Sequence, residues 1–390
     1  MAKHFRRICI TLFSLLWISG TLPAADRLAF RVVSKSVVYE SELDSAQPGL
    51  VRASYGDLLV SFYSGPNILT VRSTDQGAHW EKAQTVVQGA STEIAMTRLK
   101  DGTILWPFYQ EFVKEPCCQV RRYNTYVYRS TDNGKTWQGD EPIQVPMREP
   151  IPYGRIMELP DGRLLMPVWG AWKTGERWQM GTFESTDSGH TWGNYKRIGY
   201  DPKAGCRPDN GFNETSIAML SNQKLVAILR QQRVGASGGP CDTYTEPAEH
   251  FYRAVSTDLG KTWSKPEQLP LIGTSPALFV TRDGTLVLGY RDNPQHQSDT
   301  EHYGLSLRVS ADEGLTWVNE VHLEDPKGLA YSSHVQPGYP DFAELPDGKL
   351  LVVYHSVKYV GAAGEPGKPG ETIRRKRVLY LAQNVLKPVR

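Results

Sequence analysis

The sequence predicts an all-β protein, a six-bladed β-propeller in which each blade is a four-stranded antiparallel sheet around a central axis. Two internal repeats support this fold: a turn motif that occurs five times, and a turn followed by an apolar strand that occurs six times. Both recur at the spacing of a propeller blade, and no long segment has helical periodicity. We therefore expect residues 26–390 to form one propeller domain.

The turn motif is an octapeptide with the pattern Ser-x-Asp-x-Gly-x-x-Trp. Its copies are STDQGAHW, STDNGKTW, STDSGHTW, STDLGKTW and SADEGLTW. The aspartate can accept hydrogen bonds from backbone N–H groups of its own turn, the glycine can adopt a positive φ, and the tryptophan can pack beneath. We expect these aspartates to have a structural role: Asp75, Asp132, Asp187, Asp258 and Asp312.

The second repeat supplies the number of blades. Its clear copies are LKDGTILWPF, LPDGRLLMPV, TRDGTLVLGY and LPDGKLLVVY, and its weaker copies are ASYGDLLVSF and LSNQKLVAIL. Each reads as a turn followed by an apolar β-strand. The turn positions run from Gly56 through Gln223 to Gly348 at intervals of 46 to 64 residues. We expect the ring to close by pairing residues 30–39 with residues 378–385.

The first 25 residues have the pattern of a secretory signal peptide. Three basic residues precede an apolar run at residues 8–17, and small residues follow as far as Ala25. We expect residues 1–25 to be removed and the protein to be secreted or periplasmic. The rest of the sequence lacks the roughly 20 consecutive apolar residues that a membrane helix needs, so we expect no membrane insertion.

Charge and motif content narrow the range of partners. Signal removal takes three of the 44 basic residues and none of the 42 acidic residues, so the two counts become almost equal. This balance argues against a nucleic-acid or membrane-surface binder. The nine histidines show no close metal-ligand spacing, and no phosphate loop or dinucleotide fingerprint is present. We expect no metal, no cofactor and a monomer.

Polar residues near the ends of the predicted strands are the candidates for a functional site, because inner strands from all blades converge on the axis. The segment NETSIAMLSNQKLVAILR places Glu214 before an inner strand and Arg230 at the end of the next, so a hairpin brings both to one end. A surface salt bridge is the alternative. Tyr339 directly precedes the last inner strand, where a packed or stacking side chain is the alternative to a functional one. Asp341, two residues on, could project the same way.

Three further residues are candidate substrate contacts. Arg155 lies near the axis in blade three, and Arg291 ends a strand in the manner of Arg230. Two arginines offer charge-assisted, bidentate hydrogen bonds to a carboxylate, although a solvated loop arginine is the alternative for Arg291. Glu93 precedes the strand of blade two and could act as an acid if burial raised its pKa.

These motifs resemble the sialidase superfamily, whose propeller blades carry the octapeptide turns as Asp-boxes at outer turns away from the axis. The resemblance covers the chain after the signal segment. It implies that Tyr339, in its G-Y-P setting, is the nucleophile that attacks the anomeric carbon. It also implies that Glu214 assists this tyrosine and that Arg230 grips the carboxylate of the substrate.

The sequence departs from the sialidase pattern near the start of the ring. The family opens with an F-R-I-P motif, but here Ala46 stands at the arginine position and only Pro48 is kept. The loop that carries the family's acid/base aspartate reads FYSGPNILTVRS and lacks that residue, and a third clamping arginine is not evident in residues 292–307. Either other residues substitute for these groups, or the substrate is not sialic acid.

The sequence thus predicts an exo-acting glycoside hydrolase of sialidase-like type that removes a terminal, acidic sugar from a glycan or oligosaccharide. In this hypothesis Tyr339 is the nucleophile and Glu214 is its assisting base. The alternative is a non-catalytic Asp-box propeller that binds a glycan or a protein in the same pocket, since propellers serve both functions.

Overall fold

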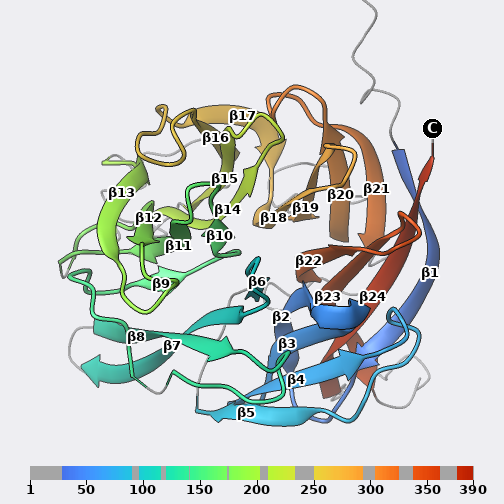
Figure 1. Ribbon diagram of the computed structural model, residues 1–390. Coiled ribbons are helices and arrows are strands. Elements are labelled where there is room, and N and C mark those ends of the chain that lie inside the picture. The colour runs from blue at the N-terminus through green and yellow to red at the C-terminus, as the bar shows by residue number, and fades with distance from the viewer. Residues whose placement is uncertain are drawn as a thin grey trace, which may run out of the picture.

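The computed structural model describes residues 29–89, 96–115, 120–139, 141–173, 175–202, 210–232, 250–292, 304–324, 337–360 and 376–389. Nearly all of its regular structure is β-strand, in six separate sheets arranged around a central axis (Figure 1). The predicted six-bladed β-propeller is confirmed. In the part of the chain that the structure describes, no helix has the length and hydropathy needed to cross a membrane.

Three blades are four-stranded sheets in which strands adjacent in sequence pair with one another. Blade one contains β2 (Ser45–Arg52), β3 (Leu58–Ser64), β4 (Asn67–Ser73) and β5 (Gln84–Gln88), with a short 3-10 helix, η2 (Ser54–Gly56), after β2. Blade four contains β14 (Gly211–Met219), β15 (Leu225–Gln232), β16 (His250–Ser256) and β17 (Glu267–Ile272). Blade five contains β18 (Thr274–Val280), β19 (Leu286–Asp292), β20 (Gly304–Ser310) and β21 (Val318–Glu324).

Blades two and three vary this plan at the inner strand. In the described residues, blade two has three strands, β6 (Thr97–Arg98), β7 (Ile104–Glu115) and β8 (Val120–Ser130). Blade three contains β9 (Ile151–Pro152), β10 (Met157–Glu158), β11 (Leu164–Gly170), β12 (Gln179–Ser185) and β13 (Gly193–Tyr200). Both β9 and β10 pair with β11, so the inner strand of blade three is interrupted between them.

Blade six joins the two ends of the chain. It contains β22 (Gly338–Glu344), β23 (Leu350–Val360), β24 (Lys376–Val389) and, as its outer strand, β1 (Ala29–Tyr39). The antiparallel β1–β24 pairing sets Phe30 opposite Pro388 and Tyr39 opposite Leu381. The predicted ring closure is confirmed, and its pairing extends beyond residue 385 to Val389. The first strand of the chain therefore completes the last blade (Figure 1).

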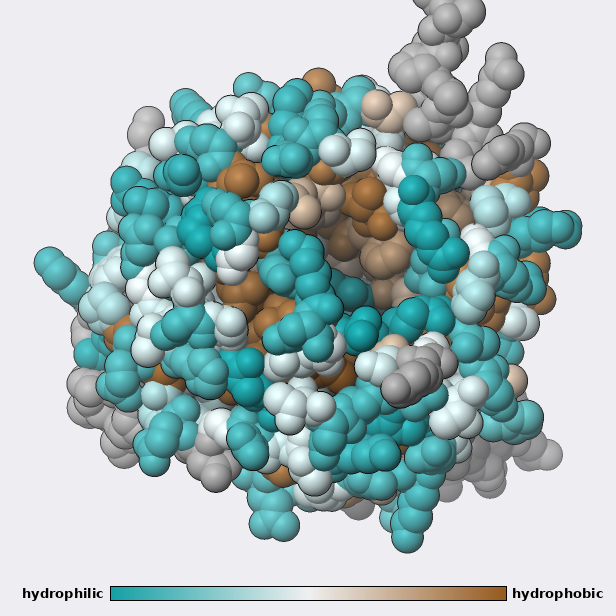
Figure 2. Space-filling view, in the orientation of Figure 1, coloured by the Kyte–Doolittle hydropathy of each residue, from teal (hydrophilic) through white to brown (hydrophobic). Residues whose placement is uncertain are grey.

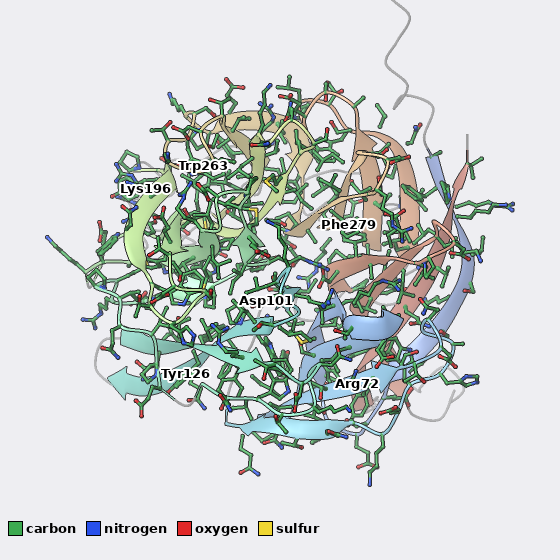
Figure 3. The ribbon with its side chains drawn as sticks, in the orientation of Figure 1. Arg72, Asp101, Tyr126, Lys196, Trp263 and Phe279 are labelled. Carbon is green, nitrogen blue, oxygen red and sulfur yellow. The ribbon has the colours of Figure 1, made fainter. Side chains whose placement is uncertain are left out.

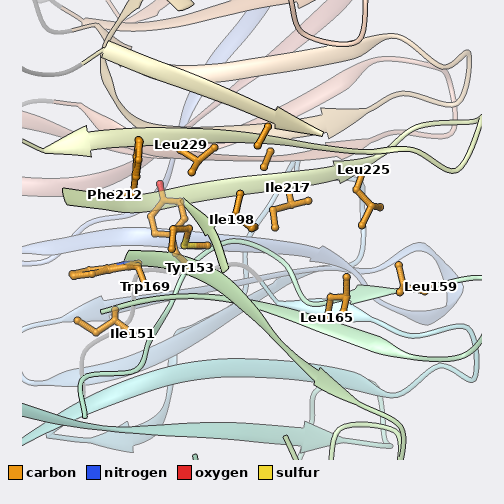
Figure 4. Packing of buried hydrophobic residues seen from close by; sticks show 13 residues of the cluster. Ile151, Tyr153, Leu159, Leu165, Trp169, Ile198, Phe212, Ile217, Leu225 and Leu229 are labelled. Atoms are coloured by element: carbon orange, nitrogen blue, oxygen red, sulfur yellow. The ribbon is translucent and has the colours of Figure 1, made fainter. Parts of the chain in front are cut away.

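The hydrophobic core is divided into six clusters, one between each pair of neighbouring blades. Strand β15 shows why its apolar run LVAIL is continuous: Leu225, Ala227 and Leu229 pack toward blade three. Val226 and Ile228, which alternate with them, pack toward blade five. Successive side chains of a strand point to opposite faces, so a blade with neighbours on both sides needs apolar residues throughout. Figure 4 shows the cluster between blades three and four.

The five Asp-boxes share one hydrogen-bonding scheme. In each box the serine hydroxyl donates to the aspartate and accepts a 2.8 Å hydrogen bond from the glycine N–H. The glycine has positive φ as predicted, and so does the residue before it: Gln76, Asn133, Ser188, Leu259 and Glu313. Each aspartate is therefore used within its own turn, which agrees with the structural role expected for it.

Candidate active site

Four inner strands contain the same irregularity near their first residues. The strand pairing shifts register there, and one non-glycine residue adopts positive φ: Gln47, Glu214, Ser275 and Tyr339. Each residue lies nine positions before the turn residue of its blade. A β-bulge changes the direction of the side chain at its position. Positive φ is a strained conformation for a non-glycine residue, and such residues cluster at functional sites. The bulges bring residues from four blades to one end of the inner strands.

Tyr339 and Glu214 meet at this end. The Tyr339 hydroxyl donates a 2.7 Å hydrogen bond to Oε1 of Glu214, although the two residues belong to blades six and four. The backbone N–H of Ser275, in the bulge of blade five, donates a 2.9 Å hydrogen bond to Oε2 of the same carboxylate. Three neighbouring blades therefore fix the glutamate and the tyrosine relative to each other.

Arg230 completes the surroundings of the carboxylate. Its Nη1 lies 2.8 Å from Oε1 of Glu214, and the side chains of the two residues are 14% and 6% exposed. Burial acts to raise the pKa of Glu214, but the charge of Arg230 and the hydrogen bonds from Tyr339 and Ser275 outweigh it. The pKa of Glu214 is held below its ordinary value, so the group is a carboxylate at neutral pH and can accept a proton from Tyr339.

Arg291 also lies beside Tyr339. Its Cζ is 5.6 Å from the centre of the tyrosine ring, and its Nε donates a 2.8 Å hydrogen bond to the carbonyl oxygen of Pro337. The buried His355 lies 5.5 Å from the same tyrosine ring, with Nε2 3.4 Å from Nη2 of Arg291. Glu214, Arg230, Arg291 and Tyr339 are thus placed together, as their positions in the sequence suggested.

Arg155 and Asp341 form a separate pair. Nη2 of Arg155 lies 2.8 Å from Oδ1 of Asp341 and also donates to the carbonyl oxygens of Leu50 and Phe342. The other carboxylate oxygen, Oδ2, accepts a 2.6 Å hydrogen bond from the N–H of Leu50. The register shift runs from Gly338 to Asp341 and includes Tyr339. The alternation that was expected to point the side chains of Tyr339 and Asp341 in the same direction is therefore broken. The pair ties blades one, three and six together.

The remaining candidate, Glu93, falls outside the described residues, so its proposed role as an acid stays a prediction. Sequence reasoning missed Ser275 and His355. Ser275 could have been found from the sequence, because it lies nine positions before the turn residue of its blade, as Glu214 and Tyr339 do. His355 gave no such signal, since its place beside Tyr339 depends on the packing of β23 within blade six.

One group of potential metal ligands occurs among the described residues, in blade five. Asp292, Glu320 and His322 bring ligand atoms within 4.8 Å of one another. Burial and then the charge of Glu320 raise the pKa of Asp292 to about 6. Glu320 already pairs with Nη2 of Arg308 at 2.7 Å and accepts a hydrogen bond from Tyr290. The cluster is thus partly neutralised by the protein itself.

Comparison with known families and proteins agrees with this architecture. Residues 31–149 and 117–352 match the family model described as a BNR repeat-like domain. A sialidase from Bacteroides fragilis is 26% identical over 211 residues, which is 50% of this chain and 34% of that protein. The chain therefore spans about a third of the length of this curated relative.

Two solved structures resemble the whole propeller. A protein of unknown function from Dyadobacter fermentans is 23% identical, with a TM-score of 0.68 over 92% of this chain and 99% of that one. The α-L-arabinanase of Penicillium chrysogenum, complexed with arabinobiose, is 15% identical, with a TM-score of 0.62 over 91% of this chain and 98% of that one. At these identities the likeness concerns the fold.

Proposed function

The chain belongs to the BNR repeat-like domain family, and from that premise we propose that it is an exo-acting glycoside hydrolase with a tyrosine nucleophile. The observation that supports this proposal is the 2.7 Å hydrogen bond from the Tyr339 hydroxyl to Glu214. A phenol is a weak nucleophile unless a neighbouring base takes its proton. The pair supplies a nucleophile and a base within hydrogen-bonding distance.

The proposed reaction has two stages. The Tyr339 oxygen attacks the anomeric carbon while its proton passes to Oε1 of Glu214, and the bond to the departing sugar oxygen breaks as that oxygen takes a proton from solvent. Water then attacks the anomeric carbon of the glycosyl-tyrosine and returns a proton to solvent, and the phenolic oxygen recovers its proton from Glu214. Arg230 stabilises the charged form of Glu214 from 2.8 Å, so the group is ionised before the tyrosine proton is transferred.

An acidic terminal sugar is the proposed substrate class. The guanidinium of Arg291 lies over the Tyr339 ring, so a sugar held against the tyrosine lies beside a positive charge. Arginine binds carboxylates through paired, charge-assisted hydrogen bonds. The charge of Arg230 is already offset by Glu214, whereas Arg291 donates to the neutral carbonyl oxygen of Pro337, and for this reason Arg291 is the proposed contact with a sugar carboxylate. Because the chain is similar to a sialidase and to an arabinanase, acidic and neutral sugars are the two substrate classes to compare.

The first test is sugar release from a panel of aryl glycosides of sialic acid, uronic acids and arabinofuranose. We expect release from an acidic member, and we expect Tyr339→Phe and Glu214→Gln to reduce kcat by about a hundredfold or more. Tyr126→Phe, on β8 of blade two, is the matched control and should retain activity. A fluorinated glycosyl fluoride that slows the second stage should label Tyr339, as mass spectrometry of its peptide would show.

Two other outcomes of this test would contradict the proposal. If no member of the panel is cleaved while glycans still bind, the same site serves recognition and the protein is a non-catalytic glycan-binding propeller. If a sugar is released and Tyr339→Phe is as active as the unmodified protein, the tyrosine mechanism is wrong even though the protein is an enzyme.

A further inference from the structure

A cavity lies at the opposite end of the inner strands from Tyr339 and Glu214. On β18, Ser275 is the second residue and Phe279 is next to last, so about 13 Å of strand separates them at ~3.3 Å per residue. The cavity has a volume of about 290 Å³. The residues that line it include Arg52, Arg155, Arg282, Glu344, Phe279 and Phe342. Figure 2 shows the face of the ring hollowed near its middle, with hydrophobic residues on the wall and hydrophilic residues around it.

The charges around this cavity do not balance. Arg155 is neutralised by Asp341, which lies 2.8 Å from it. Arg52 and Arg282 both donate to the backbone carbonyl oxygen of Glu344, at 2.8 and 3.5 Å, and Arg282 also donates to that of Leu345 at 2.8 Å. The charge of the Glu344 carboxylate acts on Arg52 as well. The carboxylate of Glu344 lies 3.8 Å from Nε of Arg282. Three guanidinium groups therefore face two carboxylates, which leaves a surplus positive charge.

Arg52 is the group most affected by this imbalance. Burial, followed by the charge of Arg282, lowers the pKa of Arg52, and Glu344 opposes this effect only in part. Two like charges that converge on one carbonyl oxygen repel each other, and a bound anion would relieve the repulsion. The geometry of the two arginines is thus suited to an anionic group.

An apolar wall lies beside the arginines. The rings of Phe279 and Phe342 are 5.9 Å apart, and Cζ of Arg155 lies 6.0 Å from the centre of the Phe279 ring. Phe342 is buried, whereas Phe279 is partly exposed, so Phe279 is the ring that a ligand can reach. In Figure 3, Phe279 is labelled close to the middle of the ring, whereas Lys196 is at its rim.

We propose that this cavity binds a small organic carboxylate, with the anionic group at Arg52 and Arg282 and a planar or apolar face against Phe279. Ligand cavities in proteins usually have volumes of roughly 300–1,000 Å³, so this cavity suits a single ring. Acidic sugars and aromatic acids both have such a carboxylate and an apolar face. The site is separate from the proposed catalytic pair and does not depend on it.

Calorimetric titration tests this proposal with benzoate and glucuronate as probes, and benzyl alcohol and glucose as their neutral counterparts. We expect at least one carboxylate to bind about tenfold more tightly than its neutral counterpart. Arg282→Gln should weaken that binding about tenfold, and Arg282→Lys should restore part of it. Phe279→Ala should weaken the same probe. Arg197→Gln, an exposed arginine on β13, is the matched control and should bind like the unmodified protein.

Tyr339→Phe distinguishes this cavity from the site at the other end of the axis, because it should leave the affinity for the carboxylate unchanged. The urea midpoint of each variant shows whether folding is intact. The proposal is overturned if both carboxylates bind no more tightly than their neutral counterparts. It is also overturned if folded Arg282→Gln binds like the unmodified protein, or if Tyr339→Phe abolishes binding. None of these results bears on whether Tyr339 is a nucleophile.

Discussion

The hydroxyl of Tyr339 lies 2.7 Å from Oε1 of Glu214, although 125 residues separate the two in the chain. The contact exists because each residue occupies a β-bulge at the same position of its blade's inner strand. Both residues have positive φ, a conformation that costs on the order of 1–3 kcal/mol for a non-glycine residue. Packing within the surrounding sheets must stabilise this backbone geometry. The hydrogen bond shows that the two bulges bring the side chains of Tyr339 and Glu214 together.

Arg230→Met should be strongly destabilising. Glu214 is buried and its nearest cation is Arg230, so the substitution leaves a carboxylate without its main compensating charge. Breaking a buried ion pair in this way costs about 3–5 kcal/mol. Urea unfolding at neutral pH should show this loss, and Arg230→Met combined with Glu214→Gln should recover a large part of it. A single variant as stable as the unmodified protein would mean that other groups compensate Glu214.

Acid should weaken the fold partly through Glu214. Its pKa in the folded protein lies below the ordinary value, so its contribution to stability is complete above the unfolded pKa of about 4.3. That contribution is lost as the pH falls through the lower folded pKa. Stability measured by urea unfolding between about pH 6 and pH 3 should therefore decline less steeply in Glu214→Gln. Equal slopes in the two proteins would show that the pKa of Glu214 is the same in the folded and unfolded states.

Gly338→Ala should displace Arg291 without unfolding the protein. A β-carbon at Gly338 would overlap the guanidinium of Arg291, the movable end of a long side chain. For an acidic substrate we expect KM to rise about tenfold while kcat changes little, because a binding contact is lost rather than the nucleophile. Gly193→Ala is the matched control, since nothing lies within 4 Å of its added carbon. Unchanged KM in Gly338→Ala would exclude Arg291 as the anchor.

Much of the fold was predictable because its signals are local. Each Asp-box carries its own hydrogen-bond donors, acceptors and glycine, so five copies identify five blades without knowledge of tertiary contacts. The site was predictable only in part. The separation of Asp341 from Tyr339 depends on a bulge, and a bulge is fixed by pairing between strands rather than by the residues in it. For the same reason the pair formed by Arg155 and Asp341 was not foreseen.

Asp258→Ala should lower stability and leave the proposed activity intact. The carboxylate accepts hydrogen bonds from the Ser256 hydroxyl at 2.8 Å, the Thr262 N–H at 2.9 Å and the Thr262 hydroxyl at 2.6 Å. Its removal leaves these donors to solvent, at a cost of about 1–2 kcal/mol in the free energy of unfolding. The urea midpoint measures this cost. A loss of kcat larger than the loss of folded protein would contradict the structural role of the box.

Deletion of residues 29–39 should open the ring. This segment is β1, the outer strand of blade six, and its removal leaves the hydrogen-bonding edge of β24 without a partner. It also removes Phe30 and Val38 from the clusters that blade six shares with blades five and one. An exposed, unpaired strand edge favours association with other chains. We expect the truncated protein to elute as oligomers in size-exclusion chromatography and to unfold at lower urea.

The same strand supplies the control for this deletion. Val33 is 44% exposed on β1, so Val33→Ser should change the free energy of unfolding by no more than about 0.5 kcal/mol. A truncated protein that stays monomeric and keeps its urea midpoint would show that β22, β23 and β24 form a stable blade without β1. The β1–β24 pairing would then be an addition to a ring that is already closed by side-chain packing between blades.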